Sequence, residues 1–371
     1  MNGRPDLGME AVQRLAKLWQ VDDDRVRWVD AGFDWWPGRF RVSVRWDKHP
    51  DTSSEPAWRL VVQTALLKEI PPDDNKMQRD IFEFADLAPS YAWVYPPAEL
   101  LQLFSRPEFG VPREVPEEVR SRLGRMVWFQ TTVYLREQMS KWLPDFLSAM
   151  AVLQPGDAEW LAERAAEILG GRLDVSRASE AAPSHFDDML NMAKAVYLPK
   201  GQEDSRWGGI DEFRNIAEEY GRSKFCFGIV DSQGVALETS FGPCTAMISV
   251  RSDVSHPLLG KGLHAAVHLP LMTEKMARYE CMSLNYMEAS IWTDIPQFSS
   301  WCPRKVGEDQ FEPYTGFFIP NALYRPLVAT NAALWQIARA RWVKANRWPD
   351  LKDVPLREIL AQRFKESGGL N

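Results

Sequence analysis

Cysteines are scarce in this sequence, and those present are far apart. Cys226, Cys244, Cys281 and Cys302 form no C-x-x-C pair in a chain of 371 residues. This spacing favours buried free thiols in a reducing cytoplasm over a disulfide framework.

Long apolar runs and an excess of positive charge are also missing. Residues 1–6 lack the apolar core of a secretory signal, and no uncharged apolar run reaches the roughly 18 residues of a membrane span. The formal net charge of −7 disfavours attraction to a phosphate backbone. We therefore expect a cytoplasmic protein with neither a membrane nor a nucleic acid as partner.

Complete catalytic motifs are absent too. Residues 260–262 (Gly-Lys-Gly) lack the spacing of a P-loop and precede a predicted strand. Ser255-His256 lies in no G-x-S-x-G elbow, and residues 22–24 lack the ligand alternation of a calcium loop. These absences predict a non-enzymatic protein with no cofactor and no metal.

Tryptophan, in contrast, is abundant, with 16 residues in the chain. Indole rings build cores, and they also anchor recognition surfaces. The 45% hydrophobic and 26% charged content is typical of a globular protein, and the length fits two domains.

A repeated pattern links the two halves of the chain. Residues 43–47 (Ser-Val-Arg-Trp-Asp) recur at 249–253 (Ser-Val-Arg-Ser-Asp), an offset of 249 − 43 = 206. Residues 76–93 match 275–292, with Lys-Met at the start and Trp at the end, at an offset of 275 − 76 = 199. Two anchors in the same order predict a duplicated domain. A duplicated domain without a catalytic set points to binding.

Hydrophobic periodicity predicts similar α+β elements in both halves. The first half is predicted to contain a helix at Met9–Gln20, strands at Arg25–Trp36, Phe40–Asp47 and Trp58–Leu67, a helix at Met77–Tyr91, a strand at Met126–Leu135, and helices at Arg136–Leu153 and Asp157–Leu169. The second half is predicted as α-β-β-β-α-β-β-α, with a helix at Asp211–Tyr220, strands at Gly234–Phe241, Thr245–Asp253 and Leu263–Leu271, a helix at Thr273–Trp292, strands at Phe298–Arg304 and Gln310–Ile319, and a helix at Ala322–Trp348.

The domain boundaries follow from these elements. We predict a first domain at 1–171 with a helical insertion, a connection at 172–206, a second domain at 207–348 and a helical tail at 349–371. Matching the apolar faces of the third strands, at Val62 and Val267, requires an offset of 267 − 62 = 205.

The order of elements resembles the type III secretion chaperone-like fold, which YbjN-like proteins and the TY-Chap domains of bacterial conflict systems share. The resemblance covers about 207–348 and, with an insertion, about 9–170. It implies two tandem domains, each a twisted, mainly antiparallel sheet packed by helices. It also implies a non-enzymatic adaptor or chaperone that binds a protein segment, with the two copies forming internally the pair that single-domain members make as homodimers.

His264 and His268 are the first candidate site residues. Even spacing places both on one face of a strand, with His256 nearby. Residues i and i+4 of a strand are about 13 Å apart at ~3.3 Å per residue, which is too far for a shared metal ion. Solvated or sheet-face histidines are therefore the favoured interpretation.

Arg45 with Asp47, and Arg251 with Asp253, are the second set. Each pair shares a strand face, so cross-strand ion pairs are one interpretation. A charged rim that both copies present to a partner is the other, and such a rim would govern specificity and association rate.

Trp35 and Trp36 stand beside the Pro37-Gly38 turn. Adjacent strand residues face opposite ways, so one ring can enter the core while the other packs under a helix or anchors a partner.

These features together favour a cytoplasmic adaptor or chaperone that binds a partner protein through apolar and aromatic surface rimmed by charge. The alternative is an enzyme that acts on a small molecule in a cleft between the domains, with His256, His264 or His268 as base. A structural homo-oligomer remains a third interpretation.

Overall fold

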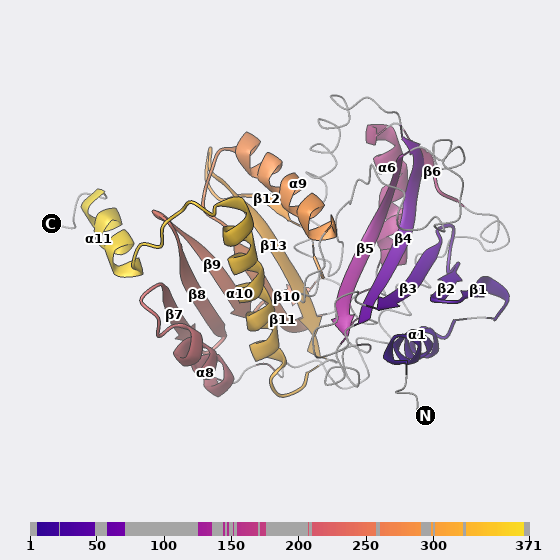
Figure 1. Ribbon diagram of the computed structural model, residues 1–371, viewed down its shortest axis with the longest axis horizontal. Coiled ribbons are helices and arrows are strands. Elements are labelled where there is room, and N and C mark those ends of the chain that lie inside the picture. Colours follow the sequence, from indigo (N-terminus) through magenta and orange to yellow (C-terminus); the bar gives the residue numbers. More distant parts are fainter. Residues whose placement is uncertain are drawn as a thin grey trace. The chain divides into compact units, whose positions relative to one another are not determined.

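The computed structural model divides into two compact α+β units (Figure 1). One contains Met1–Tyr197 with Asn285–Ser300, and the other contains Leu198–Leu284 with Trp301–Asn371. The structure describes residues 6–21, 23–48, 58–70, 125–135, 154–169, 171–175, 210–256, 260–290, 301–321 and 324–366, together with 144, 147, 151, 207, 298 and 299. Each unit contains one antiparallel sheet, which confirms the predicted α+β class with mainly antiparallel sheets.

The sheet of the first unit has the strand order β1-β2-β3-β4-β5, with β6 paired to β4. The alternation of apolar residues sets which face of each strand is buried. The strands are β1 (Val26–Val29), β2 (Gly32–Trp35), β3 (Val42–Lys48), β4 (Trp58–Ile70), β5 (Arg125–Leu135) and β6 (Arg172–Leu173); the helices are α1 (Leu7–Leu18), the 3-10 turn η1 (Asp23–Arg25) and α6 (Gln154–Leu169).

Helix α1 begins where the sequence supplies a cap. The Asp6 carboxylate accepts hydrogen bonds from the backbone N–H groups of Gly8 and Met9, 3.1 and 3.2 Å away. Its buried stripe, which includes Val12 and Leu15, lies on the side that packs against β3 and β4.

The sheet of the second unit has the order β12-β13-β11-β9-β8-β7, with β10 paired to β11. Helices α8 and α10 pack on one face of it, as Figure 1 shows. The strands are β7 (Cys226–Asp231), β8 (Gly234–Phe241), β9 (Cys244–Arg251), β10 (Ser255–His256), β11 (Gly260–His268), β12 (Cys302–Lys305) and β13 (Phe311–Pro320); the helices are α8 (Ile210–Tyr220), α9 (Glu274–Ser290), α10 (Val328–Arg347) and α11 (Leu356–Glu366).

The two sheets share a strand order and a register. β1-β2-β3-β4-β5 in the first corresponds to β7-β8-β9-β11-β13 in the second. Both begin with a hairpin of two loop residues, followed by a glycine that pairs with the arginine of the repeated Ser-Val-Arg: Gly32 with Arg45, and Gly234 with Arg251.

The same steric constraint explains why both positions are glycine. A β-carbon at Gly32 would collide with the carbonyl oxygen of Val44, and one at Gly234 with that of Val250. Close backbone approach therefore excludes a side chain there. This shared detail supports the predicted duplication, with an anchor at an offset of 234 − 32 = 202 that periodicity alone did not reveal.

Several predicted boundaries are wrong. Arg25–Trp36 is two short strands rather than one, and β7 was not predicted. The connection predicted to start at 172 begins too early, because Arg172–Leu173 pairs with β4. A strand of two residues carries no periodic signal.

The offset predicted for the third strands is also wrong. Val44 pairs with Val62, and Val250 pairs with Ala265, so the structural offset is 265 − 62 = 203 rather than 205. The error of two residues keeps every side chain on its predicted face, because the period of a strand is two.

Other predictions lie outside the described residues. They include the helix at Met77–Tyr91 and the first copy of the anchor at 76–93.

Candidate functional site

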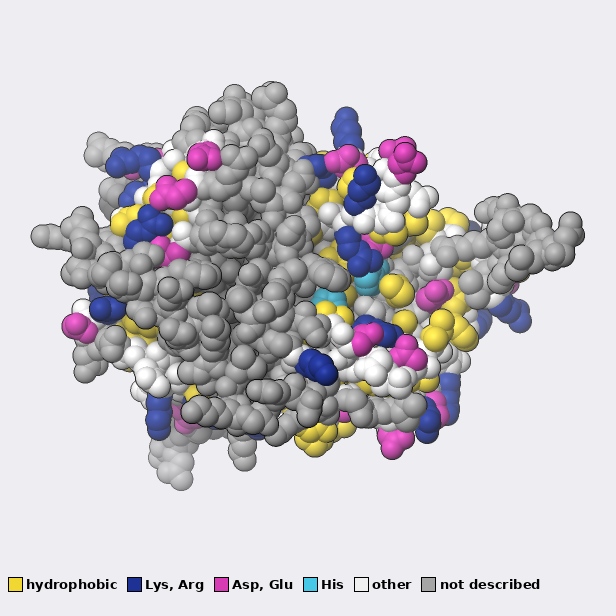
Figure 2. All heavy atoms as spheres, turned by 180° about the vertical axis from the view of Figure 1, so that it is seen from behind, with side chains coloured by type: hydrophobic (Ala, Val, Ile, Leu, Met, Phe, Trp, Pro, Cys, Tyr) yellow, Lys and Arg dark blue, Asp and Glu magenta, His cyan; other side chains and the backbone are white. Residues whose placement is uncertain are grey.

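The second sheet has an apolar side and an opposite side that carries several polar residues. On the apolar face, Phe317 lies beside Trp335 of α10, with ring centroids 6.4 Å apart. Polar side chains on the opposite face come from neighbouring strands and form one connected cluster. We call this cluster the polar face; its members are Ser249, His264, His268, Arg304, Glu312 and Tyr314. Figure 2 views the molecule from the side opposite to Figure 1 and shows histidine side chains among charged and hydrophobic ones.

A chain of hydrogen bonds crosses the polar face. The Ser249 hydroxyl on β9 lies 3.1 Å from Nε2 of His268 on β11. Nδ1 of the same imidazole lies 2.9 Å from the Glu312 carboxylate on β13. Arg304 on β12 donates its Nε–H to that carboxylate at 2.6 Å. We call these four residues the Ser249 relay.

His264 lies in the same cluster but outside this chain. Its Nε2 is 2.8 Å from the Tyr314 hydroxyl, and both side chains are buried. Burial is the main cause that lowers the pKa of His264 to about 3, with smaller contributions from the neighbouring His268 and Arg304, so the His264 imidazole is neutral at neutral pH. Burial also raises the pKa of Tyr314.

Gly316 makes the contact between His264 and Tyr314 possible. A β-carbon there would lie 2.5 Å from the Tyr314 hydroxyl and 2.8 Å from Nε2 of His264. The prediction that His264 and His268 lie on a sheet face is confirmed. The alternative prediction that they are solvated is wrong, because both side chains are buried. Among the described residues, no group of three His, Cys, Asp or Glu side chains could hold a metal ion.

The four cysteines are free thiols, as predicted, but their exposure differs. Cys281 and Cys302 are buried, and burial raises the pKa of both thiols. Cys244 is exposed, so the expectation of burial is wrong there.

All four predicted charged residues form ion pairs, but Arg45 and Asp47 pair with other residues, whereas Arg251 and Asp253 pair with each other. Arg45 pairs with the buried Asp34 on β2, and Asp47 receives two hydrogen bonds from Arg59, its cross-strand neighbour on β4. The cross-strand interpretation is therefore confirmed in the first unit.

In the second unit, Arg251 pairs with both Asp253 and Asp231. It donates two hydrogen bonds to Asp253, at 2.9 and 2.6 Å, and one to Asp231 on β7, at 2.7 Å. These groups are partly exposed. A charged rim that receives a partner stays a prediction.

Trp35 and Trp36 are both buried. Trp35 stacks on Trp19 with ring centroids 5.7 Å apart, and the Arg27 guanidinium lies 5.9 Å from the Trp36 ring. The prediction of a surface anchor is wrong for both rings, because Trp35 on β2 and Trp36, which follows that strand, are both buried.

Two of the exposed apolar side chains lie on the outer strand β7. Phe227 is 47% exposed and Ile229 is 54% exposed. Gly228, which lies between them, faces α8 and packs against Ala217. Among the described residues β7 has one strand neighbour, β8, so its outer backbone edge has no strand partner there.

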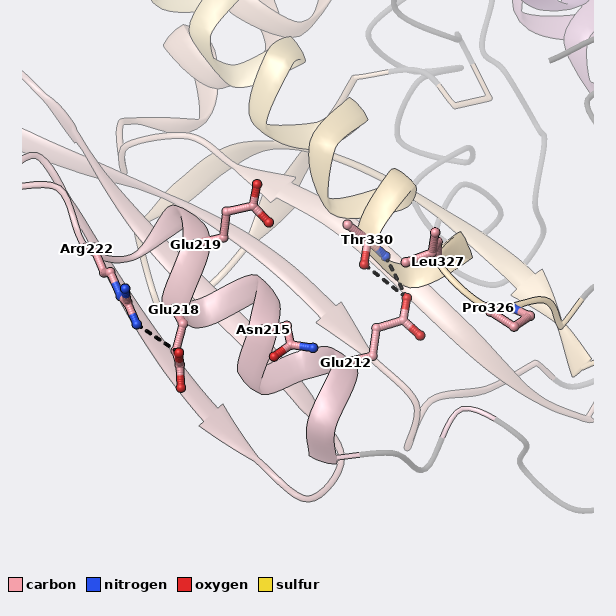
Figure 3. A pocket seen from close by; sticks show the side chains of 8 residues that line it. All are labelled: Glu212, Asn215, Glu218, Glu219, Arg222, Pro326, Leu327 and Thr330. Atoms are coloured by element: carbon pink, nitrogen blue, oxygen red, sulfur yellow. Dashed lines mark hydrogen bonds and ion pairs between the residues drawn. The ribbon is translucent and has the colours of Figure 1, made fainter. Parts of the chain in front are cut away.

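A pocket of about 800 Å³ lies between α8 and the start of α10 (Figure 3). The Glu212 carboxylate accepts hydrogen bonds from the backbone N–H and the hydroxyl of Thr330, both at 3.1 Å. It thereby caps α10, whose N-cap Leu327 offers no side-chain hydrogen bond. Leu327 is exposed and has a φ of 70°, a strained conformation for a bulky residue.

The charges of this pocket are unbalanced. Glu212, Glu218 and Glu219 line it with a single cation, Arg222, which pairs with Glu218 at 2.9 Å. Charge complementarity therefore favours a cationic group over an anionic one.

Sequence reasoning found two members of the polar face and missed four: Ser249, Arg304, Glu312 and Tyr314. The available signal was alternation, which places Ser249 on the face opposite Ile248 and Val250. It could not show that β9, β11, β13 and β12 lie side by side, and only that order brings the four together.

No protein-family model, curated protein or solved structure matches the chain. In the described residues, no helix is long and apolar enough to cross a membrane.

Proposed function

We propose that this protein acts as an adaptor or chaperone-like protein, and that it binds an extended segment of a partner protein along β7 without a catalytic step. The observation that carries the proposal is the alternation on this strand. Phe227 and Ile229 are exposed, while Gly228 between them packs against Ala217 of α8. A polypeptide that pairs with an unpaired strand edge gains main-chain hydrogen bonds and places every second side chain against such residues.

The charge near this edge suggests the composition of the segment. Helix α8 packs against β7, and its carboxylates line the acidic pocket. A segment with apolar residues at alternate positions and a basic residue at one end fits both features. The resemblance to secretion chaperone-like folds supports the same class of partner. The free state of all four cysteines supports the cytoplasmic location that we propose.

Suppression of aggregation tests the proposal. Insulin reduced with dithiothreitol exposes an apolar chain, and its aggregation is followed by light scattering without ATP. We expect the protein to suppress this aggregation near a stoichiometric ratio. An Ile229→Lys variant should need severalfold more protein, because a charge replaces apolar surface at the centre of the edge.

Met276→Lys is the matched control, since Met276 is equally exposed but lies on α9. It should act like the wild type. Absence of suppression by the wild type, or equal loss in both variants, would count against binding along β7. A peptide array of extended apolar sequences with Lys or Glu at one end then tests the charge preference: equal binding of both sets would contradict it.

A further inference from the structure

The duplication places two serines at equivalent positions in different surroundings. Ser43 and Ser249 each open a Ser-Val-Arg tripeptide, and both are buried. The Ser43 hydroxyl donates to the Asp34 carboxylate at 2.7 Å, an ordinary structural hydrogen bond. At Ser249 the nearby group is the His268 imidazole. The second copy therefore places an imidazole, the commonest general base, beside the hydroxyl.

The Ser249 relay has the connectivity of an activated nucleophile. The serine oxygen lies 3.1 Å from Nε2 of His268, and Nδ1 lies 2.9 Å from Glu312. Both distances are within the hydrogen-bond reach that nucleophile, base and orienting group require. The ion pair with Arg304 fixes the Glu312 carboxylate in position.

The tautomer of His268 decides whether Ser249 is activated. Nδ1 also lies 3.1 Å from an Arg304 nitrogen, which could donate to it. A proton on Nδ1 forms the shorter, charge-assisted bond to Glu312. Nε2 then keeps its lone pair for the Ser249 proton.

The cross-strand neighbours of Ser249 are small. Ala236 pairs with it on β8 and Ala266 on β11, and Gly316 follows on β13. Ser249 itself is 8% exposed. No bulky residue stands directly opposite the hydroxyl in this row, and the low exposure limits a reactant to a small group.

We propose that Ser249 is a nucleophile that accepts a small acyl group from an activated ester or thioester, with His268 as its base and Glu312 as a positioning residue. The Ser249 oxygen forms a bond to the acyl carbon, and its proton passes to Nε2 of His268. The bond from carbon to the leaving oxygen or sulfur breaks, and the leaving group takes that proton. Water then attacks the acyl carbon, gives a proton through His268 to the serine oxygen, and releases the acid. This site is independent of segment binding along β7.

The test uses p-nitrophenyl acetate as the acyl donor and the full-length chain. Release of p-nitrophenol is followed by absorbance, and the acetylated residue is located by peptide mass spectrometry after short reaction times. We expect acetyl on the peptide that contains Ser249 and none on that with Ser43. Ser249→Ala should abolish this labelling, and His268→Gln should slow it about 100-fold, the typical contribution of a general base.

Three controls keep the result decisive. Ser43→Ala, the matched variant in the first copy, should label at the wild-type rate. The position of the acetyl group in the wild-type protein can be determined by mass spectrometry whether or not any variant folds. Nitrogen NMR of His268 should show the proton on Nδ1. Labelling of neither serine, equal labelling of both, or a proton on Nε2 in place of Nδ1 would overturn the proposal.

Discussion

The repeated arginines provide a matched comparison of one ion pair in two environments. Arg45 pairs with Asp34, whose side chain is fully buried, and Arg251 pairs with Asp231, whose side chain is 53% exposed. We compare Asp34→Asn with Asp231→Asn, since each removes one negative charge and keeps the shape of the side chain.

The expected losses of unfolding free energy differ because water can take the place of the lost carboxylate only at the exposed site, Asp231. Breaking a buried pair costs about 3–5 kcal/mol of unfolding free energy, and the partial exposure of Arg45 places Asp34→Asn near about 3 kcal/mol. An exposed pair contributes about 0–1 kcal/mol. Arg251 also keeps Asp253 as a partner, so Asp231→Asn should lie near the lower end.

The dependence on pH has a defined sign. Burial acts to raise the pKa of Asp34, but the charge of Arg45 and hydrogen bonds from Ser43 and Arg27 together hold it below its ordinary value of 3.8. A lowered folded pKa means that the stabilisation is complete above the ordinary value and is lost as pH falls through the folded one. The difference between wild type and Asp34→Asn should be constant near neutral pH and shrink below about pH 3.8.

Hydrogen exchange in increasing urea, read by mass spectrometry, measures the loss of protection that each substitution causes in the unit that contains it. Peptides from β2 and β3 report on Asp34, and peptides from β7 and β9 report on Asp231. Equal losses of protection in the two variants, or a difference for Asp34→Asn that does not change in acid, would refute the assignment of a buried, charged Asp34.

Two glycine substitutions test close packing. Gly316→Ala should cost about 1–3 kcal/mol in urea unfolding, because its β-carbon displaces the hydrogen bond between Tyr314 and His264; an unchanged midpoint would contradict that geometry. Gly8→Ala would ordinarily stabilise α1, yet its β-carbon would lie 2.5 Å from the Trp46 ring, so destabilisation by about 1–3 kcal/mol is expected. A Trp46→Leu background should remove that penalty in a double-mutant cycle, whereas additive effects would show that the ring is not the obstacle.

Much of the fold was predictable because the strands alternate clearly. Thr245–Asp253 and Leu263–Leu271 were predicted close to β9 and β11. The helix predicted at Asp211–Tyr220 matches α8, which begins one residue earlier and ends at the same residue. The hairpin at Val26–Trp35 was missed, because its loop residues Asp30 and Ala31 give no strong turn signal.

The candidate site was predictable only in part. Alternation placed His264 and His268 together on one face, and the structure agrees. The burial of Trp35 was not predictable, because a strand buried on both faces has no apolar pattern that distinguishes it from a strand with one exposed ring.

The sequence by itself determined the two-unit α+β plan and the faces on which the alternating residues of β9 and β11 lie, because both follow from local periodicity and from a repeat along one chain. Tertiary structure alone decided which polar residues meet. Glu312 reaches His268 and Ser249 only because β13 pairs with β11 and β11 with β9, and such pairing joins residues 63 positions apart (312 − 249 = 63). Contacts between strands depend on register and strand order, and those are properties of the packed sheet rather than of any one segment.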